Sequence, residues 1–175
     1  AAAAISGFAV LRGQAAVDDL APFLDDRSGR KAAAAMAGLM KYGGAQGAVL
    51  ADVRLDTLLH DDDPWKRLFA FKVLGDTWGY GFVDTAAGLL AVNDDALRRE
   101  TVRYCARLKD AGLVPLLVPL LADSVLRLDV LATLRAMPSQ SLAALSQAFS
   151  DGATPLETRR LLALAIAAAG GTAAF

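Results

Sequence analysis

The chain has 175 residues, a formal net charge of −1 and a single cysteine, Cys105. A charge so close to zero gives no overall basic field to attract nucleic acid or anionic lipid, and one cysteine excludes an internal disulfide. Apolar residues make up 55% of the chain, and much of that share is Ala and Leu, so the composition favours packed helices over sheets.

The mean hydropathy of +0.38 raises the question of a membrane segment. The longest apolar stretches, residues 113–122 and 161–175, are shorter than the ~20 residues that a spanning helix needs. The apolar residues 1–11 lack the basic segment that opens a secretory signal. Because a lone cysteine suits a reducing compartment, we expect a cytoplasmic protein that meets a membrane only indirectly, through an attached transmembrane domain.

An acidic turn followed by an arginine and an Ala/Leu-rich segment recurs along the chain. It occurs in residues 23–30, 58–67, 89–99 and 120–127 and, after an insertion, in residues 148–160. The arginines of these turns lie roughly 30 residues apart, within the range of periods found in helical repeat proteins. They are Arg30, Arg67, Arg99, Arg127 and Arg160.

Each repeat predicts two helices. The acidic residues favour the start of the first helix, and apolar residues then recur at helical spacing. A turn that contains Gly or Pro ends this helix, as at Gly43-Gly44 and Gly112. A second, more apolar helix is expected over residues 45–59, 82–91, 113–121 and 139–149, and no segment alternates as a strand does.

The predicted fold is therefore all-α, with about ten or eleven helices in antiparallel pairs. A single pair cannot bury its apolar faces, whereas stacked pairs bury a continuous core, so we expect an α-solenoid (superhelix) of about five to six repeats. It forms one domain over residues 1–175. Its units are approximately 1–24, 25–59, 60–91, 92–121, 122–149 and an incomplete 150–175.

This repeat resembles HEAT repeats, specifically the short HEAT-like or PBS-lyase type. The matching features are the Asp-rich turn, the arginine, the Ala/Leu helix that ends near Gly, and a Pro- or Val-bearing second helix that ends in Leu-Leu; residues 90–121 are the best copy. The resemblance implies the fold and no particular chemistry. Residues 38–59, 120–134 and 158–171 are also similar to the soluble HEAT segments of bacterial nucleotide-transporter-like membrane proteins.

Paired Asp and Arg residues are the most regular polar feature. We interpret them as a structural ladder, in which each Arg reaches turn carbonyls or the acidic turn of a neighbouring unit, because catalytic carboxylates are expected once and not in every repeat. Substituting Arg99 by Ala is then expected to lower stability by ~1–3 kcal/mol. The pairs are Asp62 with Arg67, Asp94 with Arg99, and Asp123 with Arg127.

Other polar groups give no catalytic, metal-ligating or cofactor-binding pattern, so we expect no enzyme. His60 is the only histidine and sits in an acidic turn, whereas zinc sites draw several His or Cys ligands. Cys105 lies on the apolar stripe of its helix and is predicted to be core. Arg99, Arg103 and Arg107 form an i, i+4 row that is interpreted as a solvated helix face.

Two features point to a partner. Trp78, Tyr80 and Phe82 place three aromatic rings in a turn between helices, where they either anchor an interface or fill the seam between units. The predicted second helices contain one cation, Arg54, so a surface made by them is apolar or neutral and suits a peptide, a helix or an adjacent domain. Exposure of such a surface also favours self-association.

The expected function is a non-catalytic protein-interaction or spacer scaffold, a soluble part of a larger bacterial-type protein. Its partner is another protein or an adjacent domain of the same chain, and not nucleic acid. One alternative is a nucleic-acid-binding HEAT-like protein of the DNA glycosylase type, which requires a basic groove. The other alternative is a bilin-lyase-like enzyme subunit, which is supported only by the shared repeat.

Overall fold

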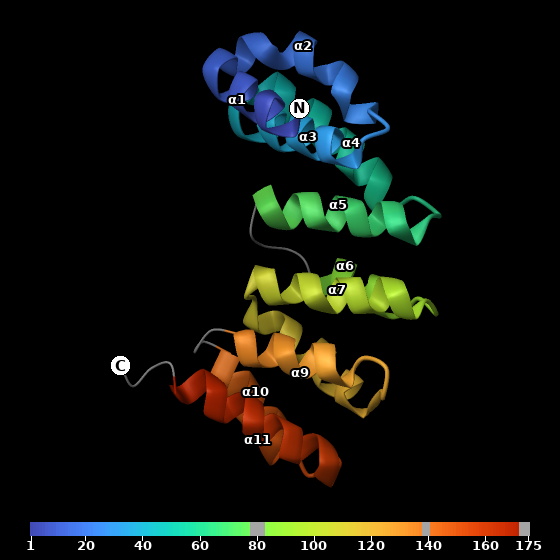
Figure 1. Cartoon of the computed structure of the whole chain (residues 1–175), viewed down its shortest axis with the longest axis vertical. Coiled ribbons are helices and arrows are strands. Elements are labelled where there is room, and N and C mark those ends of the chain that lie inside the picture. The colour runs from blue at the N-terminus through green and yellow to red at the C-terminus, as the bar shows by residue number, and fades with distance from the viewer. Residues whose placement is uncertain (78–82, 138–140, 172–175) are drawn as a thin grey trace. The chain divides into compact units, whose positions relative to one another are not determined.

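The computed structural model describes residues 1–77, 83–137 and 141–171, apart from the side chains of residues 169–171 (Figure 1). Within these ranges every regular element is an α-helix or a 3₁₀-helix, and no strand is present. The prediction of an all-helical chain is confirmed. The chain divides into two compact units, Ala1–Gly79 and Tyr80–Phe175. No helix in the described ranges has the length and apolar character needed to cross a membrane.

The first unit is organised around α3, which contacts α1, η2, α4 and α5. The centre of this helix is fully buried at Ala35, Met36 and Leu39, whose spacing places them on one face. The elements of the unit are α1 (Ala2–Arg12), η1 (Gly13–Ala16), α2 (Val17–Leu20), η2 (Ala21–Asp25), α3 (Gly29–Tyr42), α4 (Gly44–Leu59) and α5 (Pro64–Thr77).

Two glycines of the first unit are required by local geometry. A β-carbon at position 38 would lie 2.7 Å from the β-carbon of Ala9, so Gly38 lets α1 and α3 approach closely. Gly44 has a φ of +61°, in the left-handed region that glycine adopts without steric cost. The turn predicted at Gly43-Gly44 therefore separates α3 from α4.

In the second unit α7 contacts α9, and α9 contacts α11 (Figure 1). A buried hydrogen bond joins the first two, because the hydroxyl of Thr133 donates to the carbonyl of Val102 at 3.1 Å. Of the other elements, η4 contacts α9 and α11, and α10 contacts α8 and α11. The elements are α6 (Val83–Leu90), α7 (Asp95–Leu108), η3 (Ala111–Leu113), α8 (Val114–Leu117), η4 (Val118–Ala122), α9 (Arg127–Ala136), α10 (Leu142–Ser150) and α11 (Leu156–Gly171).

The segment from η3 to η4 replaces the single helix predicted over residues 113–121. Pro115 and Pro119 lack the N–H that an α-helix needs, and 3₁₀-helix is found on both sides of α8. The prolines are exposed, so the segment is not covered on every side. Its opposite face is buried through Leu113, Leu117 and Leu121.

A hydrogen-bonded aspartate precedes α3, α5, α7, α9 and α11. In each case a side-chain oxygen accepts the backbone N–H of the residue two positions later, at 2.8–2.9 Å. This local bond fixes the turn from which the helix starts. The aspartates are Asp26, Asp61, Asp94, Asp123 and Asp151.

Candidate binding groove

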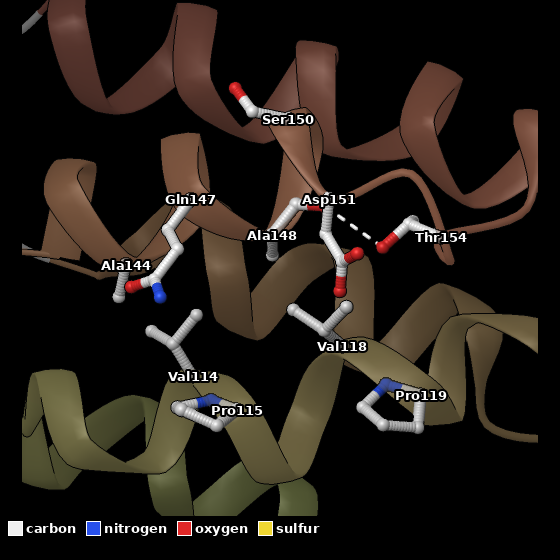
Figure 2. Close-up of a pocket in the computed structure, with 10 residues that line it drawn as sticks. All are labelled: Val114, Pro115, Val118, Pro119, Ala144, Gln147, Ala148, Ser150, Asp151 and Thr154. Carbon is white, nitrogen blue, oxygen red and sulfur yellow. Dashed lines mark hydrogen bonds between the residues drawn. The ribbon is translucent and has the colours of Figure 1, made fainter.

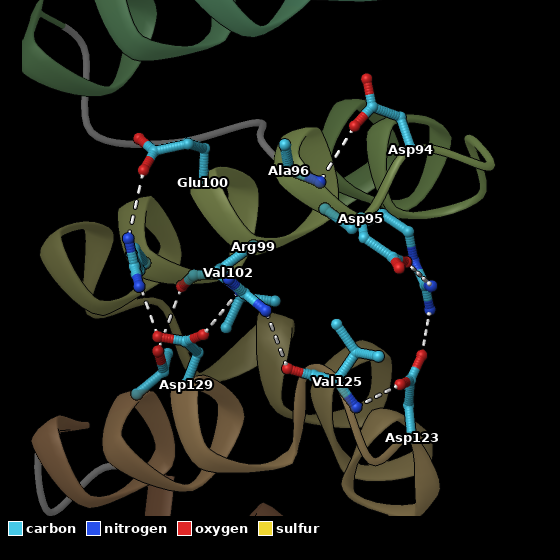
Figure 3. A network of polar contacts seen from close by, with 12 residues as sticks. Asp94, Asp95, Ala96, Arg99, Glu100, Val102, Asp123, Val125 and Asp129 are labelled. Carbon is cyan, nitrogen blue, oxygen red and sulfur yellow. Dashed lines mark hydrogen bonds and ion pairs between the residues drawn. The ribbon is translucent and has the colours of Figure 1, made fainter.

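The aspartates of the proposed ladder in the second unit hold helix ends (Figure 3). Asp94 accepts the backbone N–H groups of Ala96 and Leu97 and so caps α7. Asp123 accepts the N–H of Val125, and also Nη2 of Arg98 at 2.9 Å. These contacts, the backbone bond above all, lower the pKa of Asp123. This carboxylate therefore stabilises the fold above its unfolded pKa, and the contribution is lost as pH falls through the lowered folded pKa.

Two arginines of the second unit reach back to turn carbonyls. Nε of Arg127 donates to the carbonyl of Leu121 at 2.9 Å, and Nε of Arg159 donates to that of Thr154 at 2.8 Å. Each bond ties the first turn of a helix to the turn before it. Of the ladder arginines, Arg127 donates to a carbonyl of η4, and Arg99 donates to the carbonyl of Val125 in the turn before α9.

Arg99 reaches the turn before α9, a contact of the kind that the ladder interpretation describes, and its nearest carboxylate is Asp129 instead of Asp94. Its Nε lies 3.3 Å from Oδ2 of Asp129 without hydrogen-bond geometry, and Nη2 donates to the carbonyl of Val125 at 3.4 Å. Nε of Arg103 donates to Oδ1 of the same Asp129 at 2.9 Å. The neighbouring Arg98 is the arginine that bonds Asp123. Arg99 and Arg103 thus remain substantially exposed, with side-chain exposures of 41% and 55%, and both contact Asp129 of the same unit.

In the first unit the ladder position falls on Asp61. Its carboxylate accepts the N–H of Asp63 and an ion pair from Lys66 at 2.9 Å, whereas the side chain of Asp62 is exposed. Lys66 is the main cause of the lowered pKa of Asp61. Arg67 is half-buried, and its Nε is buried without a hydrogen-bond partner.

We expect Arg98→Ala to lower the free energy of unfolding by about 1 kcal/mol, because it removes a charged donor from a partly buried carboxylate. The side chain of Arg98 is 18% exposed, and that of Arg99 is 41% exposed. Arg99→Ala is therefore the matched control, with an expected loss below about 0.5 kcal/mol instead of the larger one that the sequence suggests. Urea denaturation measures both; a larger loss for Arg99→Ala contradicts this assignment.

A groove of about 540 Å³ runs between α10 and the segment formed by α8 and η4 (Figure 2). The valines at 114 and 118 come from one helix face and point toward α10, while Gln147 and Asp151 point back toward them. Both walls belong to segments predicted as second helices. The lining residues are Val114, Pro115, Val118, Pro119, Ala144, Gln147, Ala148, Ser150, Asp151 and Thr154.

Valine, proline and alanine side chains make most of the groove, and its polar groups lie at the rim. Gln147, Ser150 and Asp151 are exposed. Asp151 accepts the N–H of Ala153, and the hydroxyl of Thr154 donates to the carbonyl of Ala148 at 2.9 Å. The groove thus has an apolar floor and no cation in its lining.

The first unit has an apolar stripe on its second helix, α4. Val49 and Val53 are each 61% exposed, and Leu50 lies between them at 37%. Arg54, the one cation of this helix, pairs with Asp25 at 2.7 Å.

The predicted partner anchors Trp78, Tyr80 and Phe82 lie outside the described residues. Sequence reasoning named these aromatics and missed Ala144, Gln147, Ala148 and Asp151, which line the groove. The available signal was their spacing of three and four residues, which places them on one face of a helix.

The two side chains considered for catalysis or metal binding, His60 and Cys105, belong to different units of the chain. Cys105 is buried, and burial raises the pKa of its thiol to about 12, so the thiol is protonated at neutral pH. His60 is exposed and contacts the carbonyl and the carboxylate of Asp56, four residues earlier. Among the described residues, no three His, Cys, Asp or Glu side chains are grouped as metal ligands would be.

No family model and no curated protein matches the chain.

Proposed function

We propose that the chain is a HEAT-like α-solenoid that serves as a non-catalytic, cytoplasmic protein-interaction or spacer scaffold. In this proposal the groove between α10 and the α8–η4 segment receives a segment of another protein or of an adjacent domain. The observation that carries the proposal is the groove itself. It is apolar, has no cation in its lining, and lies between the α8–η4 segment and α10, which correspond to two successive predicted second helices.

Contacts within each unit support the solenoid arrangement. In the first unit α3 contacts both α1 and α5, and in the second α9 contacts both α7 and α11. Contacts between every second helix are what a stack of helix pairs requires. The aspartate turn that precedes α3, α5, α7, α9 and α11 adds a repeated local structure.

The near absence of cations from the elements at the predicted second-helix positions supports a protein partner over a nucleic acid. Binding to phosphates depends on Lys and Arg in the contact surface. Across α4, α6, α8, η4 and α10 the sequence has one such residue, Arg54, and its guanidinium is paired with Asp25. An apolar groove with acceptors at its rim suits a peptide better than a polyanion.

The proposal is tested by selecting displayed random 12-residue peptides on the protein. We expect binders that lose at least about tenfold in affinity, or about 1.4 kcal/mol, with Ala144→Gln, because the longer side chain fills the groove. Ala143→Gln is the matched control, since Ala143 is exposed on the same helix and does not line the groove.

Affinities are measured by fluorescence anisotropy with purified protein. If no binder distinguishes Ala144→Gln from Ala143→Gln, the groove is not a binding site and the proposal fails. Circular dichroism spectra and urea midpoints equal to those of the wild type establish that neither variant has unfolded.

A further inference from the structure

We infer that the segment bound in this groove is cationic: it places aliphatic side chains against the exposed rings of Pro115 and Pro119 and an Arg or Lys side chain at Asp151. This inference rests on the proposed function and specifies the chemistry of its partner. It depends on which polar groups line the groove and on whether each donates or accepts hydrogen bonds.

Asp151 supplies the charge. Its carboxylate is exposed at the groove rim, and one oxygen accepts the N–H of Ala153 at 2.9 Å. No cation among the described residues forms an ion pair with it. Arg159 belongs to the same turn, but its guanidinium donates to the carbonyls of Thr154 and Gly152. The carboxylate is therefore available to a cation from a partner.

The other polar side chains that line the groove are those of Gln147, Ser150 and Thr154. The hydroxyl of Thr154 donates its proton to the carbonyl of Ala148, so this oxygen can only accept a further hydrogen bond. Only the rotatable side chains of Gln147 and Ser150 can donate, so a donor-rich ligand is favoured.

The position of these groups favours a peptide over a small molecule. Small-molecule sites enclose their ligand and place a few polar groups deep inside. Here Gln147, Ser150 and Asp151 are exposed at the rim, while the floor has only aliphatic carbon from the valines, prolines and alanines. An extended segment with alternating side chains can place one aliphatic group in the floor and the next, cationic, group at the rim.

The groove-dependent 12-residue peptides are the probe for this inference. We expect Arg or Lys to be enriched among them at one position beside aliphatic residues. Asp151→Asn, which keeps the acceptor for Ala153, is expected to weaken their binding about five- to tenfold at low salt. The difference from wild type should shrink below about twofold at 1 M NaCl, where the Debye length is about 3 Å.

Asp84→Asn is the control, because Asp84 is an exposed carboxylate of the second unit that does not line the groove. An equal loss with both variants means a general charge effect and overturns the inference. So do groove-dependent peptides without a basic residue, or ones indifferent to Asp151→Asn, although the proposed function then stands. If no groove-dependent peptide is found, the proposed function fails first and the inference fails with it.

Discussion

Leu117→Ala is expected to lower the free energy of unfolding by about 3 kcal/mol, as in other Leu-to-Ala changes at fully buried sites. Leu117 lies at the centre of the α8–η4 segment and is 0% exposed. Two prolines deprive this segment of helical hydrogen bonds, so side-chain packing has to hold it in place. The substitution leaves a cavity beneath the groove and removes that packing.

Leu128→Ala is the control for this prediction, since Leu128 in α9 is 78% exposed and its loss should change stability by less than about 0.5 kcal/mol. Urea denaturation followed by circular dichroism measures both variants. A Leu117→Ala protein as stable as Leu128→Ala means that the segment is not anchored by its leucine face, and the described groove geometry is then wrong.

Gly38→Ala is expected to lower the free energy of unfolding by about 2 kcal/mol, although Ala is the better helix former. The new β-carbon would lie 2.7 Å from that of Ala9, closer than such atoms approach, so α1 and α3 must separate. Removing the opposing methyl group relieves this contact. The double variant Ala9→Gly with Gly38→Ala should therefore recover more than half of the loss.

Gly88→Ala provides the opposite control. Gly88 is an exposed residue of α6, and a β-carbon there meets nothing within 4 Å. This substitution should raise stability by about 0.5–1 kcal/mol through helix propensity alone. A stabilising Gly38→Ala, or a double variant less stable than either single one, contradicts the close approach of α1 and α3.

The helices were predictable because their signals are local. The predicted second helix over residues 45–59 is α4, Gly44–Leu59, and the one over 82–91 contains α6, Val83–Leu90. The break of residues 111–122 into three pieces was not predicted. Apolar periodicity continues through Pro115 and Pro119, and it reports which face is buried and not which backbone hydrogen bonds remain.

The sequence did not predict which of several adjacent ladder residues makes a given contact. Arg98 and Arg99 are adjacent, and a repeat of roughly 30 residues cannot say which of them faces Asp123, since neighbouring helical residues differ by about 100°. Asp61, Asp62 and Asp63 are likewise identical in the sequence, yet it is Asp61 that pairs with Lys66. The groove depends on side chains from two separate elements, and no spacing along one helix reveals that they meet.

The 3₁₀-helices around α8 also change the length of this part of the chain. A 3₁₀-helix rises about 2.0 Å per residue and an α-helix about 1.5 Å. With three residues in η3, four in α8 and five in η4, the segment spans about 22 Å, where a regular α-helix of the same residues would span about 18 Å. The 14 residues of α7 span about 21 Å. The stretched backbone thus lets a segment two residues shorter than α7 reach about the same length as that helix.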